Sequence, residues 1–263
     1  VNELNMNDKI CEFKHPLICK LVAHSGQRVL EALVTGELDK MQDEERRDFM
    51  KHNALPANTS IEEIHNAYIN AVKMHKLVLG KIYSIPGPKM VFQGDEEANL
   101  AYFKFFRKFS IGPEPYLKEK GYEPGLSAFL DSKLDKIKVC NKYKKVNIAV
   151  KKYTQDLNDL IQENSALTIG NIERTITHNI SDIHAIHAKF DDNEIFSVSN
   201  FSKQSYYKNY GILFPKGKWQ EILSSDEKKY FGSGMYNNNR IENEQFNYIS
   251  IPAYSIIFFK KIK

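Results

Sequence analysis

The residues best placed to do chemistry follow a short apolar run near the middle of the chain. Residues 86–88, Pro-Gly-Pro, end a helix and make a turn. Residues 89–92 then predict a buried strand, and the carboxylates Asp95, Glu96 and Glu97 come directly after it. In a barrel of parallel strands, ligands are handled at the carboxyl ends of the strands, so these acids are candidate binding groups.

A second polar group follows an earlier apolar run. Residues 17–23, LICKLVA, have the length and composition of a strand buried on both faces. His24 and Ser25 follow this run at once. If both runs are barrel strands, His24 lies at the same edge as the three acids.

The segment 86–107 resembles the eighth-strand region of the alpha-amylase superfamily, and most closely that of eukaryotic-type 1,4-alpha-glucan (glycogen) branching enzymes. The matching residues are Phe92, Gly94, Glu96, Phe105 and Arg107, with Asp95 in place of an asparagine and Tyr102 in place of a tryptophan. The residues that depart from the family pattern are Glu97, Ala98, Asn99, Ala101 and Lys104.

The earlier segment resembles the seventh barrel strand of the same enzymes, which ends in Ser-His-Asp-Gln. Here the corresponding residues are Ala23, His24, Ser25 and, after Gly26, Gln27. The family's later Asp-Phe-Met triplet occurs at 48–50. A rival register aligns the motif with His52 and Asn53, but no apolar strand leads into it. In either register the family's aspartate is absent, because its place is taken by Ser25 or Asn53.

Retaining glycosyl transfer needs two carboxylates that face each other across the scissile bond. The resemblance implies an aspartate nucleophile and a glutamate acid on strands four and five, whose motifs we expect upstream of Val1, and an aspartate where Ser25 stands. A serine supplies no charge to an oxocarbenium-like transition state. No catalytic carboxylate is therefore intact, and we expect this chain alone to be inactive.

The resemblance also implies that His24, Asp95 and Glu96 bind sugar hydroxyls, that the ligand is an alpha-glucan such as glycogen or starch, and that no metal or organic cofactor takes part. Two structural alternatives stay open: His24 satisfied by its neighbours, and Asp95 and Glu96 merely capping their loop. The missing N-terminal portion of the barrel is an implied partner. Alternatives to an enzyme fragment are a non-catalytic glucan-binding or structural relative and a degenerate chain with an unstable half-barrel.

The pattern of apolar residues divides the chain into two parts. Helical spacing predicts helices over 27–51, 61–83, 128–139 and 146–163, and Ser60 with Glu63 forms a capping-box pattern before the second. From about residue 176 the period becomes alternating, which predicts an antiparallel sandwich. This part resembles the all-beta C-terminal domain of branching enzymes. We expect the C-terminal portion of a (β/α)8 barrel (strands 7 and 8 with closing helices) over 1–170, followed by an antiparallel β-sandwich over 171–263.

Composition and single residues bound the remaining possibilities. The 263 residues carry 42% hydrophobic and 27% charged residues and a net charge of +4, with lysines spread along the chain, which argues against nucleic acid as a partner. No run reaches the length of a membrane span, and three cysteines without CxxC spacing indicate a reduced, cytoplasmic protein. His184 and His187 are expected on opposite faces of a strand and cannot share one metal ion without a bulge. Trp219 is expected in the core, as is the aromatic run 102–109.

Overall fold

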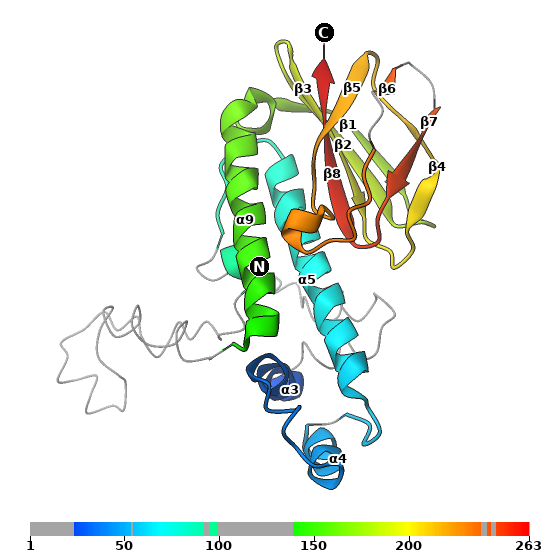
Figure 1. Cartoon of the computed structure of the whole chain (residues 1–263). Helices are drawn as coiled ribbons and strands as arrows, with labels where there is room; N and C mark the ends of the chain where they lie inside the picture. The colour runs from blue at the N-terminus through cyan, green and yellow to red at the C-terminus, as the bar shows by residue number, and fades with distance from the viewer. Residues whose placement is uncertain are drawn as a thin grey trace, which may run out of the picture.

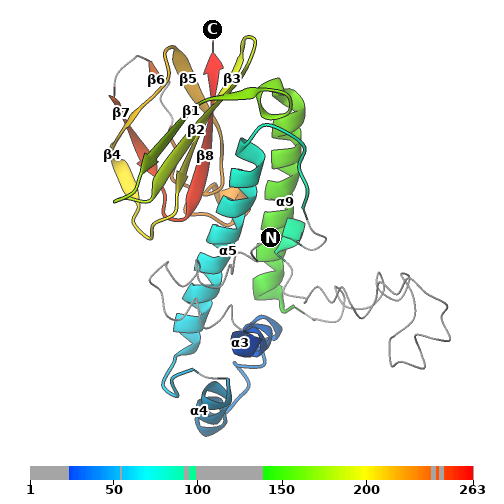
Figure 2. The same cartoon turned by 180° about the vertical axis from the view of Figure 1, so that it is seen from behind.

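The computed structural model describes residues 24–53, 55–91, 95–98, 139–237, 241–242 and 246–262, with residues 24–28 and 242 described by their backbone only. It confirms a helical part followed by antiparallel sheets (Figures 1 and 2). The expected strand 17–23, nearly all of the expected helix 128–139 and the aromatic run 102–109 lie outside the described residues. No helix in the described part combines the length and apolar character of a membrane span.

The described helices are α3 (His24–Thr35), α4 (Asp43–His52), α5 (Ile61–Ser84) and α9 (Asn141–Glu163), with the 3₁₀ turns η1 (Asp95–Glu97), η2 (Ser165–Leu167) and η3 (Lys228–Tyr230). The two long helices, α5 and α9, run side by side, and α3 and α4 lie at one end of the pair (Figure 1). The capping box that opens α5 is confirmed, with both the side chain of Ser60 and that of Glu63 bonded to the backbone.

The prediction of one helix over 27–51 is wrong, because the chain turns at Gly36. This glycine has φ +76°, a conformation that glycine adopts without a steric cost. The Gly36 N–H donates to the Leu33 carbonyl at 3.1 Å and the Glu37 N–H to the Ala32 carbonyl at 2.8 Å, which is the Schellman pattern of a helix end. The segment therefore forms α3 and α4 instead of one helix.

The expected strand over 89–92 is not formed in the described residues, since 89–91 carry neither helix nor strand. A strand requires a hydrogen-bonded neighbour, and no described strand pairs with these residues. The Lys89 ammonium instead donates to the carbonyls of Ile85 and, at 3.1 Å, of Leu167. These bonds attach the segment to the ends of the long helices.

The β-domain contains two antiparallel sheets. The strands are β1 (Asn171–His178), β2 (Ile183–Phe190), β3 (Asn193–Asn200), β4 (Tyr206–Leu213), β5 (Lys218–Ser224), β6 (Ile241–Glu242), β7 (Phe246–Ile251) and β8 (Ser255–Ile262). Six of them form one sheet in the order β1-β2-β3-β8-β5-β6, and β4 pairs with β7 in the other. The expected sandwich is thus confirmed.

The centre of the larger sheet is buried on both faces, as β8 shows. Successive side chains on a strand point to opposite faces. Ile256 and Phe258 pack with residues of α5 and α9, whereas Ile257 and Phe259 pack with β4 and β7. All four residues are fully buried. An unbroken apolar run is the sequence signature of such a strand.

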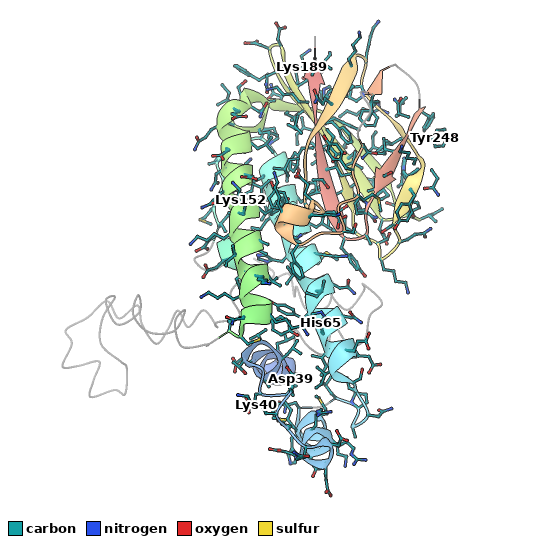
Figure 3. The ribbon with its side chains drawn as sticks, in the orientation of Figure 1. Asp39, Lys40, His65, Lys152, Lys189 and Tyr248 are labelled. Atoms are coloured by element: carbon teal, nitrogen blue, oxygen red, sulfur yellow. The ribbon has the colours of Figure 1, made fainter. Side chains whose placement is uncertain are left out.

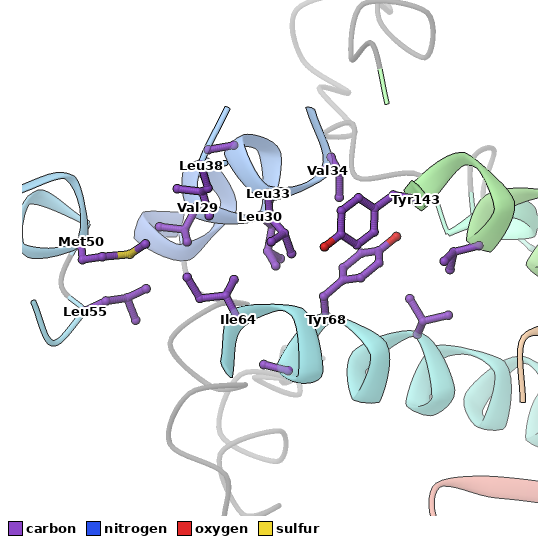
Figure 4. Close-up of a cluster of buried hydrophobic side chains, with 14 of the residues drawn as sticks. Val29, Leu30, Leu33, Val34, Leu38, Met50, Leu55, Ile64, Tyr68 and Tyr143 are labelled. Carbon is purple, nitrogen blue, oxygen red and sulfur yellow. The ribbon is translucent and has the colours of Figure 1, made fainter. Parts of the chain in front are cut away.

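At the other end of the long helices lies a second core, the helical core, which contains no strand residue in the part of the chain that the structure describes. It joins α3, the region around α4, the first half of α5 and the start of α9 (Figure 4). Tyr68 and Tyr143 meet there edge to face, with ring centroids 5.2 Å apart. Helix α5 therefore belongs to two cores, one at each end.

Candidate functional site

The acidic turn η1 carries two of the predicted binding residues, Asp95 and Glu96. It packs against α9, and it lies part-way along that helix in both views (Figures 1 and 2). Asp95 is exposed, whereas Glu96 and Glu97 are half-buried. Ala98 follows the turn and has a left-handed backbone, with φ +50°.

Both long helices hold the backbone of this turn. His75 on α5 donates from Nε2 to the Asp95 carbonyl at 2.6 Å. On α9, the Thr154 hydroxyl donates to the Glu96 carbonyl at 3.0 Å, and the Asn147 amide donates to the Glu97 carbonyl at 2.7 Å. The carbonyl groups are thus engaged within the fold, which fixes the backbone of the turn.

This arrangement can bind hydroxyl groups but does not assemble a retaining catalytic pair. Retention needs two carboxyl groups about 5–5.5 Å apart on opposite sides of the scissile bond. In η1 the three acids are consecutive residues of one short turn, and such neighbours project in different directions. They can accept hydrogen bonds from a polyhydroxylated ligand, a role in which the acids need not face one another.

The other predicted site residues, His24 and Ser25, are the first two residues of α3, three residues before the expected helix start. The structure describes their backbone and not their side chains. Helix α3 lies beyond the end of α9, whereas η1 lies along its side (Figure 1). The candidate residues therefore come from two separate elements, α3 and η1.

The described residues hold no group of three or more His, Cys, Asp or Glu side chains that could bind a metal ion. His65 bonds to Tyr143 Oη at 2.9 Å, and His75 bonds to the Asp95 carbonyl. Cys140 is a half-buried free thiol.

Sequence reasoning missed Lys76, a lysine buried at the boundary between the helices and the β-domain. It has 1% of its surface exposed. Its ammonium donates to the carbonyls of Ser225 and Tyr230, each at 2.7 Å. Burial lowers its pKa to about 8, although the nearby Asp226 carboxylate acts in the opposite direction. The spacing of apolar residues along α5 did not indicate this burial, because a lysine beside the apolar face of a helix normally faces solvent.

A second group found only in the structure is Glu221 on β5, with 3% of its surface exposed. Its Oε2 accepts from the backbone N–H of Asn237 at 3.0 Å and from the side-chain amide at 2.8 Å. Its Oε1 has no hydrogen-bond partner among the described residues. Burial raises the pKa of Glu221 to about 7 against the opposing effect of the Asn237 bonds.

The histidines of β2 are structural. His187 Nε2 lies 2.9 Å from Glu194 Oε2, and Glu194 Oε1 accepts from Lys261 Nζ at 2.7 Å, so the three residues connect β2, β3 and β8. Burial lowers the pKa of His187 despite the adjacent carboxylate. His184, on the other face, packs edge to face on Phe201. Trp219 is fully buried, as expected.

Residues 176–262, about a third of the chain, match the family described as "Alpha amylase, C-terminal all-beta domain". The matched segment begins within β1 and ends with β8. The β-domain of this chain is thus similar to the C-terminal all-beta domain of alpha-amylases. A comparison with curated proteins found no match to the sequence.

Solved structures with a similar backbone include AmyP in complex with maltose and the alpha-amylase of Geobacillus thermoleovorans complexed with acarbose. They are 14% and 11% identical, with TM-scores of 0.45 and 0.46, and each comparison covers 82% of this chain. A mutant of trehalulose synthase MutB is 14% identical over 72% of this chain, with a TM-score of 0.45. The chain spans 36% to 38% of the length of these proteins.

Proposed function

We propose that this chain is the C-terminal part of an alpha-glucan-acting protein of the 1,4-alpha-glucan branching enzyme type. The observation that carries the proposal is the match of residues 176–262 to the alpha-amylase C-terminal domain. The branching-enzyme motifs around 23–27 and 86–107 support the finer assignment. In such a protein, a 1,4-linked chain is cut and rejoined through an alpha-1,6 bond.

In this proposal residues 1–170 belong to the end of a barrel and 171–263 to the β-domain. Asp95 and Glu96 bind sugar hydroxyls from a turn whose carbonyls are fixed by α5 and α9. His24 contributes a further polar contact from α3. Ser25 stands where the family has an aspartate, so the charge that would stabilise an oxocarbenium-like transition state is missing.

The first experiment separates glucan binding from glucan chemistry. The purified 263-residue chain is incubated with amylose, and linkage analysis by NMR measures alpha-1,6 bonds while affinity electrophoresis measures retention. We expect retention in amylose-containing gels and no increase in alpha-1,6 bonds, because the catalytic pair is absent. An increase in alpha-1,6 bonds would overturn the predicted inactivity, and a chain that is not retained would overturn the assignment to glucans.

The second candidate is a non-catalytic glucan-binding or structural relative, and the serine at position 25 favours it. The variant Ser25→Asp restores the family's acid, and Ser25→Asn is the uncharged control of similar size. If the barrel end keeps a substrate-binding role, Ser25→Asp alters the retention by amylose and Ser25→Asn does not. Equal retention of both variants and the unchanged chain favours the non-catalytic relative.

A further inference from the structure

An exposed aromatic surface lies on the two-stranded sheet, away from the helices. On β7, Phe246 has 64% and Tyr248 has 70% of its surface exposed. Tyr248 lies at the outer side of the β-domain, remote from α5 and α9 (Figure 3). The two residues are separated by one position on the strand, so their side chains lie on the same face.

A glycine on the neighbouring strand forms the floor of this surface. Gly211 on β4 pairs with Tyr248 in the sheet. A Cβ added at Gly211 would lie 3.4 Å from Tyr248 Cε1 and 3.6 Å from Phe246 Cδ1. Both rings therefore lean over the backbone of β4, where any larger residue would come into contact with them. We call Gly211, Phe246 and Tyr248 the aromatic platform.

The platform is not required by the core of the β-domain. The inward side chains of the same two strands, Ile212, Ile249 and Ile251, already fill the space against the larger sheet, with at most 2% of their surface exposed. Large aromatic side chains that stay outside the core and gather on one face commonly mark a binding surface.

The charge of the sheet restricts the ligand. Strands β4 and β7 carry one lysine, Lys208, and no carboxylate, and their other polar groups are amides and hydroxyls. A nucleic acid needs several cationic groups for its phosphates, and a basic peptide needs acids. A neutral ligand with flat apolar faces and many hydroxyls fits this composition.

We propose that the aromatic platform binds a linear alpha-glucan by stacking two of its pyranose rings on Tyr248 and Phe246. The spacing of about 6.6 Å between alternate residues of a strand places the two rings in a row, which suits an extended chain of repeated rings. This inference rests on the proposed function and adds a second glucan contact, remote from η1 and α3.

The test measures the affinity of the full 263-residue chain for maltoheptaose by isothermal titration calorimetry. The variants are Tyr248→Ala, the double change Phe246→Ala with Tyr248→Ala, and Gly211→Val, which inserts a branched side chain beneath the rings. Phe231→Ala is the matched control, since Phe231 is 41% exposed and lies next to η3 on the helix side of the domain. Tyr248→Phe keeps the ring, and thermal unfolding checks that every variant is folded.

We expect the double variant to bind maltoheptaose at least about tenfold more weakly, because two stacking contacts are lost. Gly211→Val should also weaken binding, although it removes no ring. Tyr248→Phe and Phe231→Ala should bind like the unchanged chain.

If the unchanged chain binds and the double variant binds equally well, the platform is overturned and the proposed function stands. If the unchanged chain binds no glucan, the proposed function itself fails. Platform-dependent binding of a dT oligonucleotide, or platform-dependent self-association in ultracentrifugation, would overturn the choice of ligand.

Discussion

The two ends of α5 lie in different surroundings. Among the described residues, its first half packs in the helical core, through Ile64, Tyr68 and their neighbours (Figure 4). Its second half packs against α9 and against Ile256 and Phe258 of the larger sheet. The helical core is apolar, whereas the boundary with the β-domain also contains buried Lys76. The difference indicates that the second halves of α5 and α9 belong to the same folding unit as the β-domain, and that the helical core is a separate unit.

The largest expected effect comes from removing one large side chain in each core. Phe258 and Met50 are both fully buried, and truncation to alanine costs about 3–5 kcal/mol for a buried Phe and about 2–5 kcal/mol for a buried Met. We expect Phe258→Ala to lower the stability of the sheet and of the second halves of α5 and α9 together. Met50→Ala should loosen only α3, α4, the first half of α5 and the start of α9. Hydrogen exchange measured by mass spectrometry distinguishes these patterns, and equal loosening of β3 and β8 by Met50→Ala would refute two units.

Lys76→Met tests the polar part of the boundary. The methionine keeps most of the side-chain length but removes both hydrogen bonds, which leaves the carbonyls of Ser225 and Tyr230 buried without their donor. We expect a loss of about 2 kcal/mol in the free energy of unfolding at pH 7, measured by urea denaturation. Leu77→Met is a suitable control at the adjacent buried position, because it changes shape but no hydrogen bond.

The same lysine predicts a pH dependence. Its pKa is about 8 in the fold and 10.5 in the unfolded chain, so between these values the unfolded chain holds more protons. The contribution of Lys76 to the free energy of unfolding therefore rises as the pH rises from about 8 to 10.5. The difference in stability between the unchanged chain and Lys76→Met should grow over this window. A difference that stays constant with pH would contradict the buried position of the ammonium.

Gly80→Ala tests how closely α5 approaches the sheet. Alanine normally stabilises a helix interior by about 1 kcal/mol relative to glycine. Here the added Cβ would lie 2.4 Å from Ile256 Cγ2 and 2.4 Å from Tyr153 Oη, so α5 would have to move away. We expect a net loss of about 1–3 kcal/mol, the usual cost of overpacking. A rise in the melting temperature would show that α5 is not held tightly against β8.

The smallest effect is expected inside the β-domain, at Glu221. Its folded pKa of about 7 lies above the ordinary value of 4.5, so the folded chain holds more protons between these values. The stability from this group is fully present below pH 4.5 and is lost as the pH rises through 7. Glu221→Gln keeps an acceptor for Asn237 without the charge. We expect the variant to be more stable than the unchanged chain at pH 8 and similar at pH 4.5, by thermal unfolding at both values.

The apolar patterns predicted most elements but not their contacts. The alternating period that begins at about residue 176 indicated strands, and Ser60 with Glu63 identified the start of α5, because both signals are local. The break at Gly36 was missed because the apolar period continues through it, although the left-handed backbone there needs a glycine. The sequence does not indicate which of the two cores each half of α5 joins, because this depends on tertiary packing.

The candidate site was predictable only in part. The acids of η1 stood out in the sequence, but their anchors His75 and Thr154 lie 20 and 58 residues away along the chain. The aromatic platform joins Gly211 to residues about 35 positions later, which no local pattern can reveal. Lys76 and Glu221 were missed because charged residues are normally exposed.

The most direct test of the account is hydrogen exchange of the full chain with and without maltoheptaose. We expect maltoheptaose to slow exchange in β4 and β7, around Gly211 and Tyr248, with smaller protection around η1. The double platform variant should lose the protection in the sheet. Protection confined to α3 and α4, or no protection at a saturating glucan concentration, would contradict it.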